Sequence, residues 1–425
     1  MSYTTVHRCR ICGTSQLNSI LHLGDQALTG IFPRSRDERV ETGPVELVQC
    51  DSSAGGCGLV QLRQSYDPDA MYGENYGYRS GLNQSMVRHL AHRVETALAI
   101  AKPDAGDLIL DIGSNDATTL RAYPPGKYEL AGMDPTGKKF ARYYPAHVTL
   151  IPEFFSADEF RRAFPKKRAK IVTSLAMFYD LESPQEFMRE VHEVLADDGV
   201  WVFEQSYLPS MLSRLAYDTI CHEHLSYYAL RQIQWMTNRC GFKIIAVELN
   251  DTNGGSFCVT VAKSSSSHEA ARARVDELLA AEETAGLDTP APFAEFRVAV
   301  RRHRDQLCEF VRSETALGKS VFGYGASTKG NVLLQYCNFT AADIKAIAEV
   351  NEEKFGCVTP QTLIPICSEA EVRRLRPDYL LVLPWHFRNG IVQREAAYLA
   401  DGGKLVFPLP AFEVVEAHKA VRTAA

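Results

Sequence analysis

Short apolar segments alternate with stretches of helical character between residues 107 and 262, and this alternation constrains the fold more than any other feature. Such an order predicts a mainly parallel, doubly wound α/β sheet with helices on both faces. Only a turn around Asn253, Gly254 and Gly255 separates the last two segments, which predicts an antiparallel end to the sheet. The segments are DLILDIG, YELAGMD, AKIVTSLAM, GVWVFEQSY, FKIIAVEL and GSFCVTVA.

The rest of the chain divides around this central unit. Residues 82–100 carry apolar side chains at steps of four, which predicts an amphipathic helix leading into the sheet. Two polar helical stretches, about 268–286 and 291–315, form a connector before a second alternating unit that starts at SVFGYGAST. We therefore expect a cysteine-bearing N-terminal domain, a central domain and a C-terminal α/β domain with a Rossmann-like sheet. The expected boundaries are 1–75, 76–263 and 264–425.

Four cysteines near the N-terminus form two close pairs. Cys9 and Cys12 make a C-x-x-C motif, and Cys50 and Cys57 lie within QCDSSAGGCGL. Four thiolates at such spacing are typical of a tetrahedral structural zinc site, in which the metal replaces much of the core that a short segment cannot build. A redox C-x-x-C is the alternative, but it would not need the second pair. The quartet therefore predicts bound Zn²⁺.

A polar turn follows the first strand of the central unit, in LILDIGSNDATTL. It holds Asp111, Gly113, Ser114 and Asn115, and a glycine there lets the backbone approach a ligand closely. Asp134 ends the next strand, 21 residues after Gly113, where a carboxylate can accept hydrogen bonds from a ribose diol. The turn lacks G-x-G-x-x-G, so the pattern favours S-adenosylmethionine over NAD and resembles the class I methyltransferase fold.

Three side chains further along are candidates for contact with the same cofactor. Phe155 stands where an adenine ring would lie in such a fold. Ser174 and Met177 mark the segment that closes the following strand, near the methyl donor. Ordinary packing at strand ends is the alternative interpretation for each of them.

The sequence YDTICHEHLSYY, residues 217–228, concentrates ionisable side chains after a parallel strand. Doubly wound sheets place their active sites beyond the carboxyl ends of such strands. A metal site at His222 and His224 lacks a clear third ligand, and a purely structural cluster is a second alternative. Acid–base chemistry is favoured, because an imidazole titrates near neutral pH and can take a proton from carbon made acidic by an adjacent carbonyl.

A second glycine loop, FGYGASTKGN, follows a strand and precedes a helix in the C-terminal unit. It satisfies neither the dinucleotide motif nor the P-loop, which would require lysine where Asn331 stands. A helix N-terminus rich in glycine nevertheless makes a suitable pyrophosphate cradle, and Glu349 ends the next strand, where a carboxylate can hold a ribose. A sheet without a ligand is the alternative. The candidates for substrate binding are Ser327, Lys329, Asn331, Glu349, His386 and Arg388.

Composition argues against two other classes of protein. A net charge of −6 argues against nucleic acid as a partner, because duplex binding needs a concentrated basic surface. No apolar run approaches the ~20 residues that span a bilayer, so no membrane partner is expected. The N-terminal residues show no secretory signal and the 11 cysteines are scattered, so we expect a cytoplasmic protein with reduced thiols.

Several segments, in this order, resemble a known family over nearly the whole chain. The chain resembles the three-domain sugar C-3 methyltransferases of antibiotic deoxysugar pathways, such as those for tetronitrose, mycarose and noviose. The resemblance implies an N-terminal zinc module, a central S-adenosylmethionine domain and a C-terminal domain that helps to bind a sugar nucleotide. The segments are the paired cysteine motifs, MYGENYGYRSGLN (71–83), DIGSND, YDTICHEHLSYY, NGGSF (253–257) and YGASTKGN (324–331).

The resemblance also implies roles for individual residues. It makes His224 the base that takes the C-3 proton, while Glu223 orients the sugar or tunes that histidine, and Tyr76 contacts the substrate near the reacting carbon. The family commonly has tyrosine where this chain has Cys221, so one hydroxyl contact to the substrate differs. The remaining candidates for contact with the substrate or its ketone are His222, Asn253 and Tyr78.

The expected reaction is methylation of C-3 of a TDP- or GDP-linked 4-keto-6-deoxy sugar after removal of the proton beside the ketone. An O- or N-methyltransferase is the first alternative, since it needs a heteroatom acceptor rather than a base for carbon. A non-catalytic protein that binds zinc and nucleotide is the second. The protein is expected to be a monomer or a homodimer.

Overall fold

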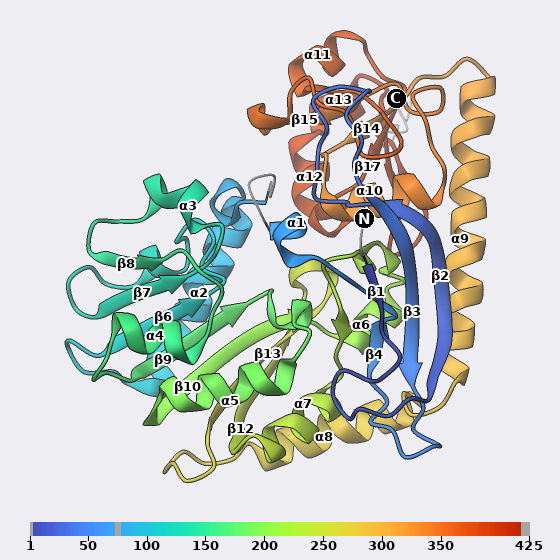
Figure 1. Ribbon diagram of the computed structural model, residues 1–425. Helices are drawn as coiled ribbons and strands as arrows, with labels where there is room; N and C mark the ends of the chain where they lie inside the picture. Colours follow the sequence, from blue (N-terminus) through green and yellow to red (C-terminus); the bar gives the residue numbers. More distant parts are fainter. Residues whose placement is uncertain (1–2, 73–77, 418–425) are drawn as a thin grey trace, which may run out of the picture.

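The structure is a computed structural model that describes residues 3–72 and 78–417. Their strands form four sheets, which belong to an N-terminal, a central and a C-terminal unit (Figure 1). Within the described part of the chain, no helix has both the length and the apolar character that crossing a membrane requires.

The N-terminal sheet is antiparallel and includes a strand from far along the chain. Its order is β11-β4-β3-β2, because Ser226 in the YDTICHEHLSYY segment lies opposite Gln61. The ladder continues where the Leu62 N–H donates to the Leu225 carbonyl over 2.9 Å. Nothing in the sequence pattern predicts this crossing. The elements of this unit are β1 (Tyr3–Thr5), β2 (Leu17–Ala27), β3 (Thr42–Cys50), β4 (Val60–Leu62), β5 (Gln64–Tyr66), β11 (Ser226–Tyr227) and α1 (Pro68–Tyr72).

The central sheet has seven strands in the order β12-β13-β10-β9-β6-β7-β8. Strands β6 to β10 are parallel, whereas β13 runs antiparallel to both β10 and β12. The predicted doubly wound sheet with an antiparallel end is therefore confirmed. Every residue of β6 and β13 is buried, as expected for strands covered on both faces. The strands are β6 (Leu108–Ile112), β7 (Glu129–Met133), β8 (Val148–Ile151), β9 (Ala169–Leu175), β10 (Leu195–Ser206), β12 (Phe242–Asn250) and β13 (Ser256–Lys263).

The helix predicted at residues 82–100 is α2 (Gln84–Ala101), and it packs against this sheet (Figure 1). Asn83 caps it by accepting a hydrogen bond from the Ser85 N–H, as short polar residues do at helix starts. The other helices and 3-10 turns of the central unit are η1 (Ser80–Leu82), η2 (Leu120–Ala122), α3 (Gly137–Phe140), η3 (Ala141–Tyr143), α4 (Ala157–Ala163), η4 (Phe178–Asp180), α5 (Pro184–Val194), α6 (Leu208–Ser213), η5 (Tyr217–Thr219), α7 (Leu230–Arg239) and η6 (Thr252–Gly254).

The C-terminal sheet confirms the predicted second α/β unit. Its order is β16-β15-β14-β17-β18-β19, and all neighbouring strands are parallel except β18 and β19. Its elements are β14 (Val321–Tyr324), α10 (Thr328–Tyr336), β15 (Ile347–Glu349), η7 (Glu352–Lys354), β16 (Ile366–Ser368), α11 (Glu369–Arg374), β17 (Tyr379–Val382), η8 (Trp385–Phe387), α12 (Arg388–Arg394), α13 (Ala396–Ala400), β18 (Lys404–Phe407) and β19 (Glu413–Val415).

Two connector helices, α8 (Arg272–Thr284) and α9 (Ala291–Ala316), link the central and C-terminal units. Figure 1 shows α9 beside β2, and the two elements are in contact. The buried His303 of α9 bonds to the Pro408 carbonyl through Nε2, so its Nδ1 accepts from the Tyr217 hydroxyl over 2.9 Å. One histidine thus joins the connector, the central unit and the C-terminal unit.

The N-terminal and C-terminal units also touch directly. The Gln335 side chain exchanges two hydrogen bonds with the backbone of Ala27, over 2.7 and 3.2 Å. The Asn331 side chain donates to the Thr29 carbonyl over 2.8 Å. All three units therefore pack against one another, while the domain boundaries after residues 75 and 263 remain predictions.

Candidate functional site

The four predicted zinc ligands meet in the N-terminal unit. The sulfur atoms of Cys9, Cys12, Cys50 and Cys57 all lie within 4.8 Å of one another, and the closest pairs are 3.5 Å apart. A tetrahedron with Zn–S bonds of about 2.3 Å has edges of about 3.8 Å, so the thiols fit this metal. Hydrogen bonds from Cys57 and Cys9 lower the pKa of the Cys50 thiol, while hydrogen bonding to Cys50 raises the pKa of Cys9 and of Cys57, so these sulfur atoms interact as one cluster.

The zinc cluster is connected to the segment that holds the predicted base. The Gln232 side chain, in α7, donates to the Cys57 carbonyl over 2.9 Å. Cys57 also precedes β4 by three positions, and β4 pairs with β11, which begins two residues after His224. The metal site therefore helps to fix the backbone on which His224 stands.

The turn after β6 has the features of a cofactor cradle. Gly113 has a φ of +72°, and a Cβ there would lie 3.1 Å from the Met177 side chain, so glycine is required for this approach. The Asp134 carboxylate accepts from the N–H groups of Asn115 and Thr136, each over 2.7 Å, and from the Thr136 hydroxyl. Because a carboxylate has about four acceptor positions, one remains for a ribose hydroxyl. The turn thus suits S-adenosylmethionine.

Asp111 lies deeper than its predicted role suggests. It is buried in β6 and accepts a hydrogen bond from the Thr173 hydroxyl of β9. Burial, with a smaller effect of the charge on Asp134, raises the pKa of Asp111 to about 7. Asp111 therefore supports the cofactor turn through its hydrogen bond to β9. Its direct contact with the cofactor stays a prediction.

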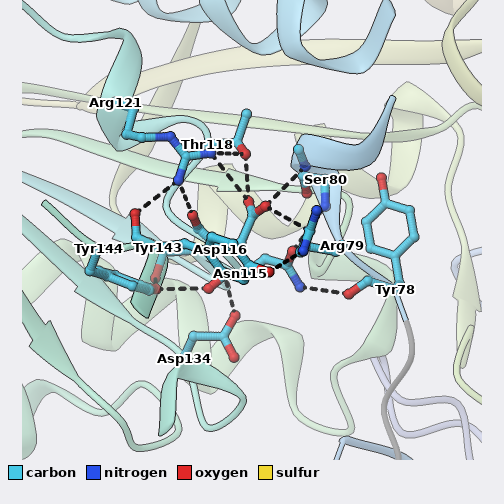
Figure 2. A network of polar contacts seen from close by, with 12 residues as sticks. Tyr78, Arg79, Ser80, Asn115, Asp116, Thr118, Arg121, Asp134, Tyr143 and Tyr144 are labelled. Carbon is cyan, nitrogen blue, oxygen red and sulfur yellow. Dashed lines mark hydrogen bonds and ion pairs between the residues drawn. The ribbon is translucent and has the colours of Figure 1, made fainter. Parts of the chain in front are cut away.

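A polar network holds residues 78–81 against the cofactor turn (Figure 2). Asn115 donates to the Tyr78 carbonyl over 3.2 Å and accepts from the Ser80 N–H over 3.0 Å. Asp116 accepts from the Gly81 N–H over 3.1 Å and pairs with Arg79 at 3.6 Å. The sequence motif MYGENYGYRSGLN is thus tied to the cofactor turn through its second half. Tyr76, predicted to contact the substrate, lies outside the described residues.

Two aromatic hydroxyls complete this network. Tyr144 donates to the Asn115 carbonyl over 3.0 Å and lies 2.8 Å from the Ser114 hydroxyl, while Arg79 bonds to Tyr143. Sequence reasoning missed both tyrosines, because the region after β7 lacks a recognisable motif. Tyr78 is exposed, and its predicted contact with the substrate stays a prediction.

The remaining cofactor candidates differ in accessibility. Met177 faces the Gly113 backbone, as described above. Ser174 is fully buried and accepts a hydrogen bond from the Trp201 indole over 2.9 Å. Phe155 is half-buried and packs against Phe187, with ring centroids 5.1 Å apart. Met177 is thus the best placed of the three to reach a cofactor.

His224 is held in one orientation. Its Nδ1 lies 2.7 Å from the Thr219 carbonyl, and because a carbonyl only accepts, Nδ1 carries the hydrogen. In the neutral ring the lone pair is therefore on Nε2, for which the described residues supply no hydrogen-bond partner. The ring packs against Tyr179, with centroids 4.4 Å apart, and Tyr179 follows Met177 by two residues. This contact places His224 near the cofactor turn.

Burial and then the charge of Lys329 lower the pKa of His224 to about 4, and the bond to Thr219 only partly offsets this. The imidazole is therefore neutral at pH 7 and able to accept a proton.

His222 lies in a different environment from His224. Its side chain is fully buried beside Tyr66 of β5, with ring centroids 4.6 Å apart and an edge-to-face angle of 82°. Burial lowers the pKa of His222 to about 4, and nearby backbone groups of Gly43 and Gln26 only partly offset this. His222 thus joins the 217–228 segment to the N-terminal unit, and its role toward the ketone stays a prediction.

We expect His222 to make the protein less stable in acid. Its pKa falls from 6.5 in the unfolded chain to about 4 in the folded protein, so the unfolded state binds more protons between these values. Above pH 6.5 the histidine is neutral in both the folded and the unfolded state. As the pH falls from 6.5 to 4, the free energy of unfolding decreases by up to about 3 kcal/mol. Urea unfolding of the wild type and of His222→Phe at pH 7.5 and 4.5 should show a smaller loss in the variant. Equal losses would mean that His222 is not held neutral.

The side chains of Glu223, Asp180 and Cys221 form a cluster of weakly acidic groups that act on one another. The Glu223 carboxylate accepts from the Thr29 hydroxyl over 3.3 Å, and a Cβ on Gly30 would lie 3.0 Å from it. Burial raises the pKa of Glu223, and burial with the Glu223 charge raises the pKa of Asp180 and of the Cys221 thiol. One Asp180 oxygen, Oδ1, is buried without a partner among the described residues. No motif in the sequence indicates that Thr29 and Gly30 lie next to Glu223.

Two of the C-terminal candidates make hydrogen bonds with the backbone of the second glycine loop. Ser327 caps α10 by accepting from the Gly330 N–H over 3.0 Å. Glu349 accepts from the N–H groups of Ala326, Val350 and Asn351 over 2.7 to 2.8 Å, so its carboxylate is largely occupied by backbone. The predicted contact of Glu349 with a ribose, like that of Ser327 with a phosphate, stays a prediction.

The other C-terminal candidates separate into two groups. The Lys329 ammonium donates a hydrogen bond to the carbonyl of Asn253, whose φ is +54°. The positive charge of Lys329 also lowers the pKa of His386, after the larger effect of burial. Asn331 is buried and bonds to the N-terminal unit, as described above. Arg388 instead donates from Nε and Nη2 to the two carboxylate oxygens of Glu413, at a partly exposed position. Lys329, Asn253 and His386 are thus brought together, whereas Arg388 is not part of this group.

Comparisons with known proteins match most of the chain. A zinc binding domain model matches residues 9–72, a methyltransferase domain model matches 82–247, and a C-methyltransferase C-terminal domain model matches 251–410. The C-methyltransferase NovU of Streptomyces niveus is 30% identical over 415 residues, which cover 97% of each chain.

Similar solved structures cover only part of the chain. The CurJ carbon methyltransferase is 14% identical over 43% of this chain and 56% of that chain, with a TM-score of 0.34. Magnesium protoporphyrin IX methyltransferase (ChlM) from Synechocystis PCC 6803, with bound S-adenosylmethionine, is 12% identical over 42% of this chain and 79% of that chain, with a TM-score of 0.32.

Proposed function

Because this chain belongs to the C-methyltransferase family that includes NovU, we propose that it methylates C-3 of a nucleotide-linked 4-keto-6-deoxy sugar. The chain is an S-adenosylmethionine-dependent C-methyltransferase with a zinc-binding N-terminal domain. The acceptor and the carbon that is methylated are parts of the proposal. The resemblance of residues 71–83, 217–228 and 324–331 to the sugar C-3 methyltransferases supports them.

The orientation of His224 carries the proposal. An O- or N-methyltransferase can use an acceptor that already has a lone pair, whereas carbon must first lose a proton. His224 is neutral, has its lone pair on Nε2 and lies beside Tyr179, near the cofactor turn. A neutral imidazole with an unpartnered lone pair is the form of histidine that can accept a proton, and this supports the proposal.

The reaction needs few steps from the protein. The Nε2 atom of His224 takes the proton from C-3, the C–H bond breaks, and its electron pair moves toward the C-4 ketone to give an enolate. When bound, S-adenosylmethionine supplies an electrophilic methyl group, which joins C-3 while the sulfur keeps the electron pair of the broken bond. The Thr219 carbonyl stabilises the imidazolium by holding its Nδ1–H, until the proton passes to water.

The cofactor turn and the segment tied to it would position the two reactants. Gly113 would let the backbone approach the cofactor, and the remaining acceptor position of Asp134 would take one ribose hydroxyl. Residues 78–81 are held on the same turn by Asn115 and Asp116. Any substrate contact made by this segment is thereby coupled to the order of the cofactor turn.

Labelled methyl transfer tests the proposal directly. The enzyme is incubated with methyl-labelled S-adenosylmethionine and TDP- or GDP-linked 4-keto-6-deoxy sugars, and the labelled carbon is identified by NMR. We expect label at C-3, and deuterium at C-3 when S-adenosylhomocysteine replaces the methyl donor in D₂O.

Sugars reduced to the alcohol at C-4 are the matched control, because they cannot form the enolate. Methylation of these alcohols, or label on oxygen or nitrogen, would contradict the proposal.

A further inference from the structure

The ammonium group of Lys329 reaches from the C-terminal unit to the central one. Lys329 lies in the first turn of α10, and its Nζ donates to the Asn253 carbonyl in η6 over 2.7 Å. An ammonium has three N–H groups, and the described residues show this single hydrogen bond, so two N–H groups remain for a ligand. The lysine of the glycine loop thus lies at the boundary between the two units.

Two further buried polar atoms, one in η5 and one in η8, have no hydrogen-bond partner among the described residues. Asp218 is fully buried, and its Oδ2 accepts from the Trp385 indole over 2.7 Å, whereas Oδ1 has no partner among the described residues. His386 Nδ1 is likewise buried and unpartnered within the described chain. Buried polar atoms normally have hydrogen bonds, so these two point to a polar ligand.

The elements that carry these groups pack against one another, because α10 contacts η5, and η6, which accepts the hydrogen bond of Lys329, contacts η8. Burial raises the pKa of Asp218, and the Lys329 charge partly offsets this. Burial and then the Lys329 charge lower the pKa of His386 to about 3, so His386 is neutral. The same cation acts on His224, as described above. Lys329 therefore lies among groups from η5, η8 and the segment that carries the base.

The charges at this position favour a ketone over a phosphate. A pyrophosphate would bring its negative charges close to the buried Asp218, and like charges repel strongly where water is excluded. Lys329 and Asp218 together are nearly neutral, which suits a carbonyl oxygen on the lysine and a neighbouring hydroxyl on Asp218 Oδ1. The start of α10 remains available for phosphate through Ser327 and the loop backbone.

We propose that the Lys329 ammonium binds the ketone oxygen of the acceptor and stabilises the negative charge that this oxygen gains during the reaction. The inference rests on the proposed function. As the C–H bond beside the ketone breaks, its proton passes to His224 Nε2 and its electron pair ends on the oxygen held by Lys329. Lys329 keeps its own proton throughout, so it acts as a fixed cation.

Lys329 affects the base and the enolate in opposite directions. Its charge disfavours the imidazolium of His224, while the other groups that face His224, Tyr179 and the Thr219 backbone, are neutral. No hydrogen bond joins Lys329 to His224 in the described structure, so a hydrogen-bonded enolate oxygen lies closer to the ammonium. Coulomb energy falls with distance, and the net effect therefore favours proton transfer.

Two substitutions test this role. Lys329→Gln keeps an N–H for the Asn253 carbonyl but removes the charge, and Lys329→Arg keeps the charge. We expect the glutamine variant to lose about 10²- to 10³-fold in kcat and in the rate of deuterium exchange beside the ketone. KM should change by less than about tenfold, and the arginine variant should recover part of both rates. The acid limb of the kcat/KM profile should move to higher pH, because the pKa of His224 rises without Lys329.

Lys354→Met is the matched control, since it removes a lysine that bonds to Ala326 of the same loop. It should leave the exchange rate within a few-fold of wild type. A rise in KM with unchanged kcat and exchange in Lys329→Gln would assign Lys329 to the pyrophosphate and overturn the proposal. The arginine variant keeps the test open if the glutamine variant does not fold. A lower kcat and exchange rate with little change in KM would support the proposal, and a higher KM with unchanged kcat would contradict it. Failure of the proposed function would appear separately, as a wild-type enzyme that methylates no 4-keto sugar.

Discussion

Replacing His224 with glutamine should lower methyl transfer by about 10²- to 10⁴-fold while leaving the affinity for S-adenosylhomocysteine unchanged. Glutamine can still donate a hydrogen bond to the Thr219 carbonyl, so the local backbone should be kept. It has no lone pair basic enough to take a proton from carbon. Single-turnover methyl transfer, with calorimetry of S-adenosylhomocysteine, measures the two quantities separately.

The neighbouring histidine supplies a matched comparison for this variant. His222→Phe removes a histidine two positions away, which packs against Tyr66 of the N-terminal unit. At pH 8 it should keep deuterium exchange beside the ketone within a few-fold of wild type, whereas His224→Gln should abolish exchange. The reverse pattern would show that His222, not His224, is the base.

Removing the zinc should abolish methyl transfer although the metal takes no part in the chemistry. Structural zinc sites of this kind contribute on the order of 10 kcal/mol to folding. In Cys50→Ser the metal loses one of its four ligands, and the N-terminal sheet should lose order. Because β4 of that sheet pairs with β11, His224 should then lose its orientation. Zinc content, methyl transfer and S-adenosylhomocysteine binding are measured on the same preparation.

The affinity for S-adenosylhomocysteine separates this effect from general unfolding. The cofactor turn belongs to the central sheet, so binding should persist in Cys50→Ser while methyl transfer is lost. Cys367→Ser, in β16 of the C-terminal unit, is the matched control and should keep both zinc and activity. Full activity in a zinc-free Cys50→Ser protein would refute the coupling between metal and base.

The sequence predicted those parts of the structure that depend on local patterns. The alternating apolar segments predicted both α/β sheets, and the antiparallel end followed from the turn around Asn253. The spacing of the cysteines predicted a cluster whose sulfur atoms do converge. These features depend on periodicity and on short-range spacing, which a single sequence contains.

What the sequence did not predict depends on packing between units. Strand β11 is only two residues long, and it becomes a strand because β4 offers its edge. The sequence placed Lys329 in a possible pyrophosphate cradle, which stays a prediction, but it gave no sign that the lysine bonds to Asn253 in another unit. A pattern along the chain contains no information on such partners.

The pairing of β11 with β4 also limits how this enzyme can be recombined with its relatives. A chimera that exchanges only residues 1–75 would join a foreign β4 to the native β11, and would set a foreign partner against the buried His222. A hybrid should therefore take segments 1–75 and 217–228 from the same parent protein, since each segment needs the other to bury its side chains. Crossover points that respect this pair should yield folded hybrids, and those that split it should not.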